Sequence, residues 1–225
     1  FLAHILDLMG LPADYSNPIN IHPSVSTKEP TEANLKAIVD RFYDGMVRCN
    51  DSVLKRLVIE NEDKGCWNCM SLFIYFHQYM GHQHRHIMPL TYDNLHDECN
   101  PSVLNGNAVT MAQNVDAFAK TWPDAVTPVF HWSNGRSDRK RNHADFADGN
   151  PPQYERPLVW EVEVKQKDFA IAKLQGKTTS PKKKATPKKV VSHKAIPKPS
   201  VRKILKDIKK TSPLLKQTFN HLYGE

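Results

Sequence analysis

Two cysteines and two histidines near the middle of the chain have the residue types and the spacing of a metal site. Twelve residues separate the cysteine pair from the first histidine, and three residues separate the two histidines. Thiolate sulfur and imidazole nitrogen are the ligands that tetrahedral zinc prefers. We therefore predict a structural zinc ion as cofactor, in a closed site whose ligands all come from the protein. The four predicted ligands are Cys66, Cys69, His82 and His86.

This spacing resembles that of a two-cysteine, two-histidine zinc finger, and Phe73 stands where such fingers keep a core aromatic residue. The segment departs from the family because Tyr79 replaces a leucine and Gly81 lies where the recognition helix would continue. The competing interpretation is a core helix over residues 67–80 that carries the cysteines on its first turn. A thioredoxin-like redox role is disfavoured, because no βαβ unit precedes the cysteine pair. The predicted substitute zinc ligands are His84, His96 and Cys99.

A lysine-rich stretch, residues 176–200, divides the chain into two parts of opposite charge. Residues 176–225 contain 13 lysines and one arginine but two acidic residues, a net charge of +12, whereas residues 1–175 carry −5. Prolines keep such a stretch extended, and each phosphate that a lysine neutralises releases a counterion. We therefore predict binding to nucleic acid, DNA before RNA, or to an acidic protein surface. The expected contact residues are Lys182, Lys183, Lys184, Lys188, Lys189, Lys194 and Lys198.

Two copies of a Ser/Thr-Pro-Lys-Lys element lie within this stretch, beginning at Ser180 and Thr186. Together with the surrounding lysine, alanine and proline, they resemble the C-terminal tail of linker histones. That resemblance implies affinity for the narrow, A/T-rich minor groove of DNA. The alternatives are a solubilising linker and a nuclear localisation signal. Ser180 and Thr186 are also predicted phosphorylation sites, where an added phosphate would subtract positive charge.

A second basic patch lies in a polar segment, residues 131–152, whose Asn-Gly and Asp-Gly pairs predict a loop. This patch is equally consistent with a solvated surface and with contact to phosphate or carboxylate groups. His143, Asp145 and Asp148 in the same loop have the side chains of metal or acid–base ligands, but no nucleophile motif or glycine-rich phosphate loop accompanies them. The patch consists of Arg136, Arg139, Lys140 and Arg141.

Apolar periodicity and capping residues predict a mainly α fold with a minor β-sheet, an α+β protein. Helices are expected over residues 31–46, 51–58 and 110–122, in addition to the segment 67–80. Alternation of apolar and polar residues predicts a strand over residues 158–165, and the best partner for it is the segment 125–132.

The predicted domain organisation has four parts. A proline-rich N-terminal arm, residues 1–30, precedes a globular, mainly helical body, residues 31–175. A basic extended tether, residues 176–200, leads to two short amphipathic helices in residues 201–225. No window of the sequence reaches the eighteen or so apolar residues that a membrane-spanning helix requires.

These features lead to a prediction of a non-enzymatic structural component of a large nucleoprotein assembly, such as a minor capsid or core protein of a virion, chromatin or a ribosome-like particle. Its body would dock on neighbouring proteins of the assembly, and its tail on nucleic acid. One alternative is a DNA-binding regulatory protein with a single divergent zinc finger. Another is an enzyme that uses the histidine-rich loop. The expected location is intracellular, either nuclear or within a particle such as a virion.

Overall fold

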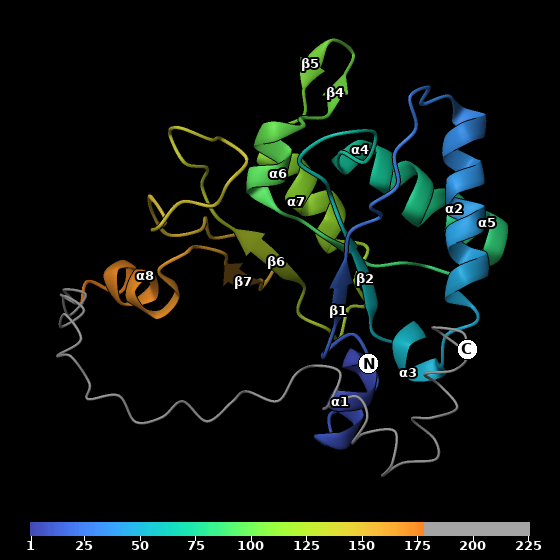
Figure 1. The fold of residues 1–225 in the computed structure, drawn as a ribbon, viewed down its shortest axis with the longest axis horizontal. Coiled ribbons are helices and arrows are strands. Elements are labelled where there is room, and N and C mark those ends of the chain that lie inside the picture. Colours follow the sequence, from blue (N-terminus) through green and yellow to red (C-terminus); the bar gives the residue numbers. More distant parts are fainter. Residues whose placement is uncertain (178–225) are drawn as a thin grey trace, which may run out of the picture. The chain divides into compact units, whose positions relative to one another are not determined.

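Five short parallel strands form the centre of the protein, and the computed structural model describes residues 1–177. Strands β1 (Ile19–Ile21), β2 (Leu57–Glu60) and β3 (Leu90–Thr91) form a parallel sheet in that order. Strands β6 (Val129–Trp132) and β7 (Val159–Val162) form a second parallel pair. A parallel bridge between Asp93 and His131 connects the two sheets, so the strands follow one another in sequence order (Figure 1).

Helical crossovers join the strands, as parallel pairing requires. Helix α2 (Glu32–Met46) and the short α3 (Asp51–Leu54) lie between β1 and β2. A continuous helical stretch of α4 (Cys69–Leu72), the π-helix η1 (Phe73–Tyr79) and α5 (Met80–His84) connects β2 to β3. No helix in the described part of the chain has the length and apolar character needed to cross a membrane. The remaining elements are α1 (Leu2–Leu8), α6 (Asn94–Cys99), α7 (Met111–Ala119), α8 (Lys167–Leu174) and the hairpin of β4 (Val103–Leu104) and β5 (Asn107–Ala108).

The hydrophobic core lies between the β1–β2–β3 sheet and the helices that cover it. Val58 and Ile59 of β2 are completely buried, as are Phe76 of η1 and Trp67. Figure 1 shows α2 and the α4–η1–α5 stretch on one side of this sheet, with β6 and β7 on the other. Burial on both faces explains why the first three residues of β2, Leu57 to Ile59, are all apolar, as expected for an interior parallel strand.

Two predicted helices are confirmed down to their first turns. The Thr31 side chain accepts a hydrogen bond from the Asn34 backbone N–H at the start of α2. Thr110 and Gln113 form a reciprocal capping box at the start of α7. The predicted partnership of segments 125–132 and 158–165 is also found, as the parallel pair β6–β7.

The fold is mixed α/β, and the helix predicted over residues 51–58 is wrong. Helix α3 ends at Leu54, and the next apolar residues form strand β2. Periodicity cannot distinguish a short buried strand from a buried helix, because both are apolar throughout.

The first thirty residues also differ from the predicted extended arm, since they contain α1 and the strand β1. The guanidinium group of Arg56, which is completely buried, fixes this segment to the start of β2. It donates hydrogen bonds to the backbone carbonyl oxygens of Leu11 and Pro12 and to the carboxylate of Asp7, at 2.6–2.8 Å. The predicted tether beyond Lys177 and the two terminal helices lie outside the described residues.

Candidate metal centre at the carboxyl ends of the strands

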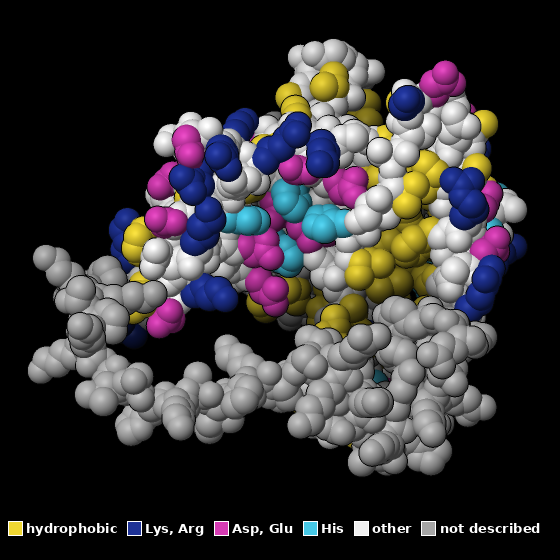
Figure 2. All heavy atoms as spheres, in the orientation of Figure 1, with side chains coloured by type: hydrophobic (Ala, Val, Ile, Leu, Met, Phe, Trp, Pro, Cys, Tyr) yellow, Lys and Arg dark blue, Asp and Glu magenta, His cyan; other side chains and the backbone are white. Residues whose placement is uncertain are grey.

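Acidic and histidine side chains gather where the parallel strands end. Because parallel strands place their carboxyl ends at one edge, residues far apart in the sequence meet there. Figure 2 shows histidines and carboxylates together in one hollow of the surface. One further histidine comes from the first turns of α6. The residues are His22 after β1, Glu60 at the end of β2, Asp93 after β3, His96 in α6, His131 in β6 and Glu163 after β7.

Glu60 is the centre of this group. Its side chain is 3% exposed, and Oε1 lies 3.1 Å from His131 Nδ1 and 3.2 Å from His96 Nδ1. The other carboxylate oxygen, Oε2, lies 3.6 Å from His22 Nε2. The side chains fall into two sets of metal-ligand atoms, each within 4.8 Å of one another, and Glu60 belongs to both. The first set is His22, Glu60 and His96, and the second is Glu60, Asp93, His131 and Glu163.

Within residues 1–177, three buried atoms of the second set have no hydrogen-bond partner in suitable geometry, although two of them, Glu60 Oε1 and His131 Nδ1, lie 3.1 Å apart. They are Glu60 Oε1, Asp93 Oδ2 and His131 Nδ1. A buried polar atom left unpaired costs about 1–3 kcal/mol, and native proteins rarely tolerate several together. A divalent cation between them would satisfy all three. Carboxylate and imidazole ligands suit manganese, iron or zinc, and the residues present therefore fit a metal ion.

The charges of these side chains also favour a bound cation. Burial opposes ionisation of Glu60, but the facing imidazoles of His131 and His96 outweigh it and hold the pKa of Glu60 well below its usual range. Burial by itself lowers the histidine values, yet contact with Glu60 raises the pKa of both His96 and His131 to about 9. Burial raises the pKa of Asp93 to about 6. The centre thus demands positive charge, which either histidine protons or a bound cation can supply.

A buried asparagine positions the ligands of two neighbouring strands. The Asn61 side chain accepts from the Asp93 backbone N–H at 2.8 Å and donates to the Asp93 carbonyl oxygen at 3.0 Å. It therefore continues the β2–β3 pairing past the last strand residue, as a peptide group would. The backbone carbonyl oxygen of Asn61 lies 2.9 Å from His96 Nδ1 and fixes the orientation of that ring.

We expect Asn61→Ala to weaken metal binding about 10- to 100-fold, the usual cost of losing such an outer contact. It should also lower the free energy of unfolding by about 1–3 kcal/mol, because the buried Asp93 N–H loses its partner. The Asp93 carbonyl oxygen keeps the Asp97 N–H, at 3.1 Å. Calorimetric titration with Mn²⁺ and denaturant unfolding measure the two effects. Asn107→Ala, at an exposed position in β5, is the matched control. Equal metal affinity in the two variants would refute the positioning role.

The structure does not bring the predicted zinc ligands together. Cys69 stands at the start of the α4–η1–α5 stretch and His82 near its end, and thirteen helical residues span roughly 20 Å. Burial raises the pKa of the Cys69 thiol well above its usual range, which disfavours the thiolate that zinc needs. Its Sγ instead contacts the Asp97 carboxylate at 3.6 Å. Cys66 is half-buried, and His86 follows α5. Neither residue belongs to a set of possible metal ligands among the described residues.

Of the predicted substitute ligands, His96 belongs to the candidate metal centre, where it is grouped with His22 and Glu60 rather than with the cysteines. His84 Nε2 contacts the Asp40 carboxylate at 2.7 Å, and its ring stacks on Tyr43. Cys99 Sγ lies 4.0 Å from the Lys140 carbonyl oxygen.

The polar loop between β6 and β7 borders the metal centre. His143 Nε2 lies 3.7 Å from Glu163 Oε2, so this histidine joins the edge of the site. The basic patch of Arg136, Arg139, Lys140 and Arg141 lies on the same loop. The lysines predicted to bind nucleic acid and the phosphorylation sites Ser180 and Thr186 lie outside the described residues.

Most residues of the candidate metal centre lie far apart in the sequence and form no local motif. A signal was nevertheless present, since several short apolar runs end in an acidic residue or a histidine. Ile19–Ile21 precedes His22, Leu57 to Ile59 precede Glu60, and Phe130 precedes His131. Repeated strand-to-ligand boundaries of this kind are typical of (β/α) folds, whose active sites lie at the carboxyl ends of the strands.

The fold and the site therefore define a class: an α/β protein with a candidate metal centre at the carboxyl edge of consecutive parallel strands. Residues 1–194 match the family model described as UV-endonuclease UvdE. The chain belongs to the UvdE family.

Two known proteins resemble the chain. A protein named UV DNA damage endonuclease from Nostoc sp. is 25% identical over 174 residues, which is 77% of this chain and 48% of that protein. The chain thus spans about half the length of this curated relative. A solved structure titled "Crystal Structure of SacUVDE" superposes with a TM-score of 0.55 at 22% identity, covering 79% of this chain and 57% of that one. This likeness supports a shared fold.

Family membership overturns three predictions. The chain is not characterised by local resemblances to a zinc finger and a linker-histone tail, because one family model covers residues 1–194. The predicted non-enzymatic structural component of a virion or other nucleoprotein assembly is wrong, as is the zinc-finger regulator, since the family is one of endonucleases. The low charge of the body and the strongly basic tail suggested assembly, but neither feature reports on the metal centre.

Proposed function

We propose that this chain forms part of a metal-dependent endonuclease that hydrolyses phosphodiester bonds in UV-damaged DNA. The observation that carries the proposal is the pair of metal-ligand sets that share Glu60, within a chain of the UvdE family. The name of the Nostoc relative supplies the substrate class.

A divalent cation at this centre would act as a Lewis acid on a phosphodiester and on the water that attacks it. Glu60 and Asp93 would hold the cation through their negative charge, and His131 would supply a nitrogen ligand. His143 lies at the edge of the centre, 3.7 Å from Glu163, where its Nε2 can exchange a proton with a substrate oxygen. Glu60, Asp93 and His131 are buried, whereas the side chains of His22 and Glu163 are 38% and 39% exposed, so bulk water reaches the centre from their side.

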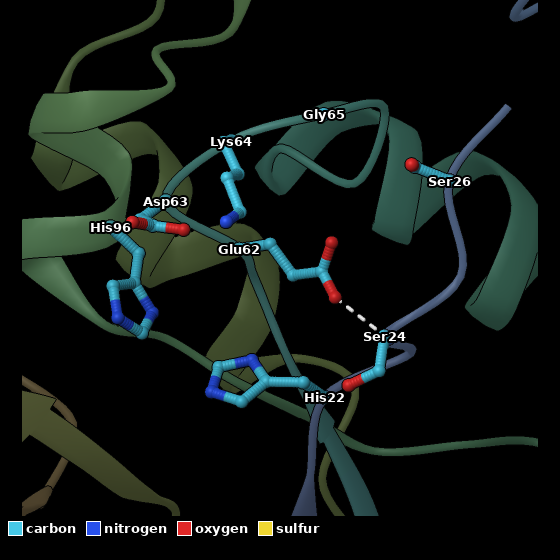
Figure 3. Close-up of a pocket in the computed structure, with 8 residues that line it drawn as sticks. All are labelled: His22, Ser24, Ser26, Glu62, Asp63, Lys64, Gly65 and His96. Atoms are coloured by element: carbon cyan, nitrogen blue, oxygen red, sulfur yellow. Dashed lines mark hydrogen bonds between the residues drawn. The ribbon is translucent and has the colours of Figure 1, made fainter. Parts of the chain in front are cut away.

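A pocket of about 580 Å³ adjoins the centre (Figure 3). His22 and His96 of the first ligand set line it, and Lys64 extends toward it from the β2–α4 loop. The Ser24 backbone N–H donates to the Glu62 carboxylate at 2.7 Å across its rim. A pocket of this size accommodates a nucleotide, and a damaged base costs less energy to take out of the base stack than an intact one. We propose that the pocket receives part of the damaged strand.

The basic tail fits the same function. Lys182, Lys183 and Lys184, with the lysines that follow them, would add sequence-independent affinity for the DNA backbone. The prediction of a nucleic-acid partner is therefore retained as a proposal, with DNA as substrate rather than as a component of an assembly.

The test is cleavage of supercoiled plasmid that has been irradiated with ultraviolet light. We expect the purified chain to nick irradiated plasmid in the presence of Mn²⁺, and to stop when EDTA is added. Unirradiated plasmid is the matched substrate control and should remain intact. Nicking of both plasmids alike, or nicking that persists in EDTA, would contradict the proposal. Calorimetric titration with Mn²⁺ reports on the metal centre separately from cleavage.

A further inference from the structure

The basic loop between β6 and β7 begins and ends at the metal centre. It leaves the sheet just after His131 and returns at His143, and both histidines contact Glu163. The four basic residues of the patch lie between these two points. Figure 2 shows Lys and Arg side chains bordering the histidine hollow along one side. Their positions are therefore set relative to the reacting phosphate rather than to a distant surface.

The loop is held in one shape by its own backbone. The Arg136 N–H donates to the Asn142 carbonyl oxygen at 2.8 Å, and Gly135 pairs with His143 in an antiparallel bridge. Gly135 is required for this crossing, since a Cβ there would lie 2.0 Å from the Lys140 carbonyl oxygen. A loop that is already ordered loses little conformational entropy when it binds, and so favours a binding surface.

Two of the four cations are neutralised within the protein, and two are not. Arg136 forms a two-point contact with Asp138 at 2.8 and 3.0 Å, and Arg141 Nε lies 3.7 Å from the Asp63 carboxylate. Lys140 Nζ donates to the neutral backbone carbonyl of Glu98 at 3.1 Å. Arg139 has no ionic or hydrogen-bond partner for its side chain within residues 1–177.

Unpaired positive charge on this loop is unexpected, because residues 1–175 carry a net charge of −5. Carboxylates are plentiful nearby, yet none pairs with Arg139 or Lys140 among the described contacts. Such a pair of uncompensated cations, beside a centre proposed to act on phosphodiesters, has the charge needed to contact the phosphates of a DNA backbone.

We propose that Arg139 and Lys140 bind backbone phosphates of the DNA strand next to the phosphodiester held at the metal centre. The proposal rests on the proposed function and deepens it by naming the surface that positions the substrate. Arg136 and Arg141 shape the loop through Asp138 and Asp63, whereas Arg139 and Lys140 make the contact. These two are positioning residues, since phosphate contacts fix the register of DNA without reading its sequence.

The test compares two double variants that remove the same charge. Arg139→Ala/Lys140→Ala changes the loop, and Lys55→Ala/Lys120→Ala changes two exposed lysines toward the amino ends of the strands. Lys55 lies two residues before β2. Lys120 precedes Thr121, whose hydroxyl accepts a hydrogen bond from the Leu90 backbone N–H at the start of β3. Within residues 1–177, both control lysines take part only in exposed i,i+4 ion pairs, which contribute little to stability.

Binding to a fluorescent DNA duplex is measured by anisotropy in EDTA over a series of salt concentrations. For the loop variant, the slope of log affinity against log salt should fall by about two, one per lost phosphate contact. Its KM for irradiated DNA should rise about tenfold or more with kcat nearly unchanged. Its Mn²⁺ titration should match that of the unaltered chain, which shows that the loop and centre remain folded.

Equal salt slopes for the two double variants would overturn the proposal. Failure of the proposed function would look different, because the unaltered chain would then not nick irradiated DNA. Its affinity for the duplex could still be compared with that of both variants. The lysine-rich tail contributes equally to all three proteins, so it cancels from the difference.

Discussion

Glu60→Gln is expected to lower Mn²⁺-dependent nicking of irradiated DNA more than about 100-fold. Loss of an outer contact to a metal ligand already costs about 10- to 100-fold, and Glu60 is a direct ligand in both sets. The glutamine amide is neutral, so the site loses the negative charge that attracts the cation. The amide nitrogen is not a metal ligand. Calorimetric titration should show that Mn²⁺ binding is lost together with activity.

Glu155→Gln is the matched control, because Glu155 is exposed and lies outside both ligand sets. It makes the same chemical change and should leave metal binding and nicking unaltered. If Glu60→Gln bound Mn²⁺ with the affinity of the unaltered chain, the shared ligand would have to be a different residue. Circular dichroism of both variants checks that the fold persists.

Arg56→Met is expected to lower the free energy of unfolding by about 3–5 kcal/mol, the usual cost of removing one partner of a buried ionic and hydrogen-bonded group. Methionine fills a similar volume but leaves the Leu11 carbonyl oxygen without a donor. The Pro12 carbonyl oxygen keeps only the Asn17 side-chain amide, at 3.3 Å. The segment that carries α1 and β1 would lose its attachment to β2, and with it the position of His22. Urea unfolding followed by tryptophan fluorescence measures the change.

Lys55→Met is the control for this second prediction, since Lys55 neighbours Arg56 but is exposed and pairs weakly with Asp51 at 3.8 Å. Its free energy of unfolding should change by less than about 1 kcal/mol. A comparable loss in both variants would show that the buried guanidinium is not what fixes the N-terminal segment.

Local signals predicted the amphipathic helices well. Thr31 and Thr110 cap helices that begin where the sequence indicated, because capping depends on residues within one turn. The pairing of β6 with β7 was also predictable from the apolar alternation of residues 158–165. These features need no information from distant parts of the chain.

The parallel sheet was not predictable in the same way. Each of β1, β2 and β3 has two to four residues, and β2 is apolar on both faces up to Glu60. Such a short run has no alternation, and its pairing is defined only when the helical crossovers bring it beside its neighbours. The prolines of residues 1–30 favoured an extended arm, although Ile19–Ile21 pairs with β2 in the interior.

The metal centre illustrates the same limit for function. Close spacing drew attention to Cys66, Cys69, His82 and His86, because a zinc finger is a local motif. The true cluster joins residues from His22 to Glu163, and only the order of the strands brings them together. The charge pattern predicted a nucleic-acid partner, which is consistent with the proposed endonuclease, but charge says nothing about catalysis.

Anomalous X-ray scattering from crystals grown with Mn²⁺ tests the central claim most directly. We expect manganese peaks within ligand distance of the Glu60 carboxylate, one beside His96 and His22 and one beside Asp93 and His131. A peak at Cys66 and Cys69 with none at Glu60, or no ordered manganese at the carboxyl ends of the strands, would contradict the account.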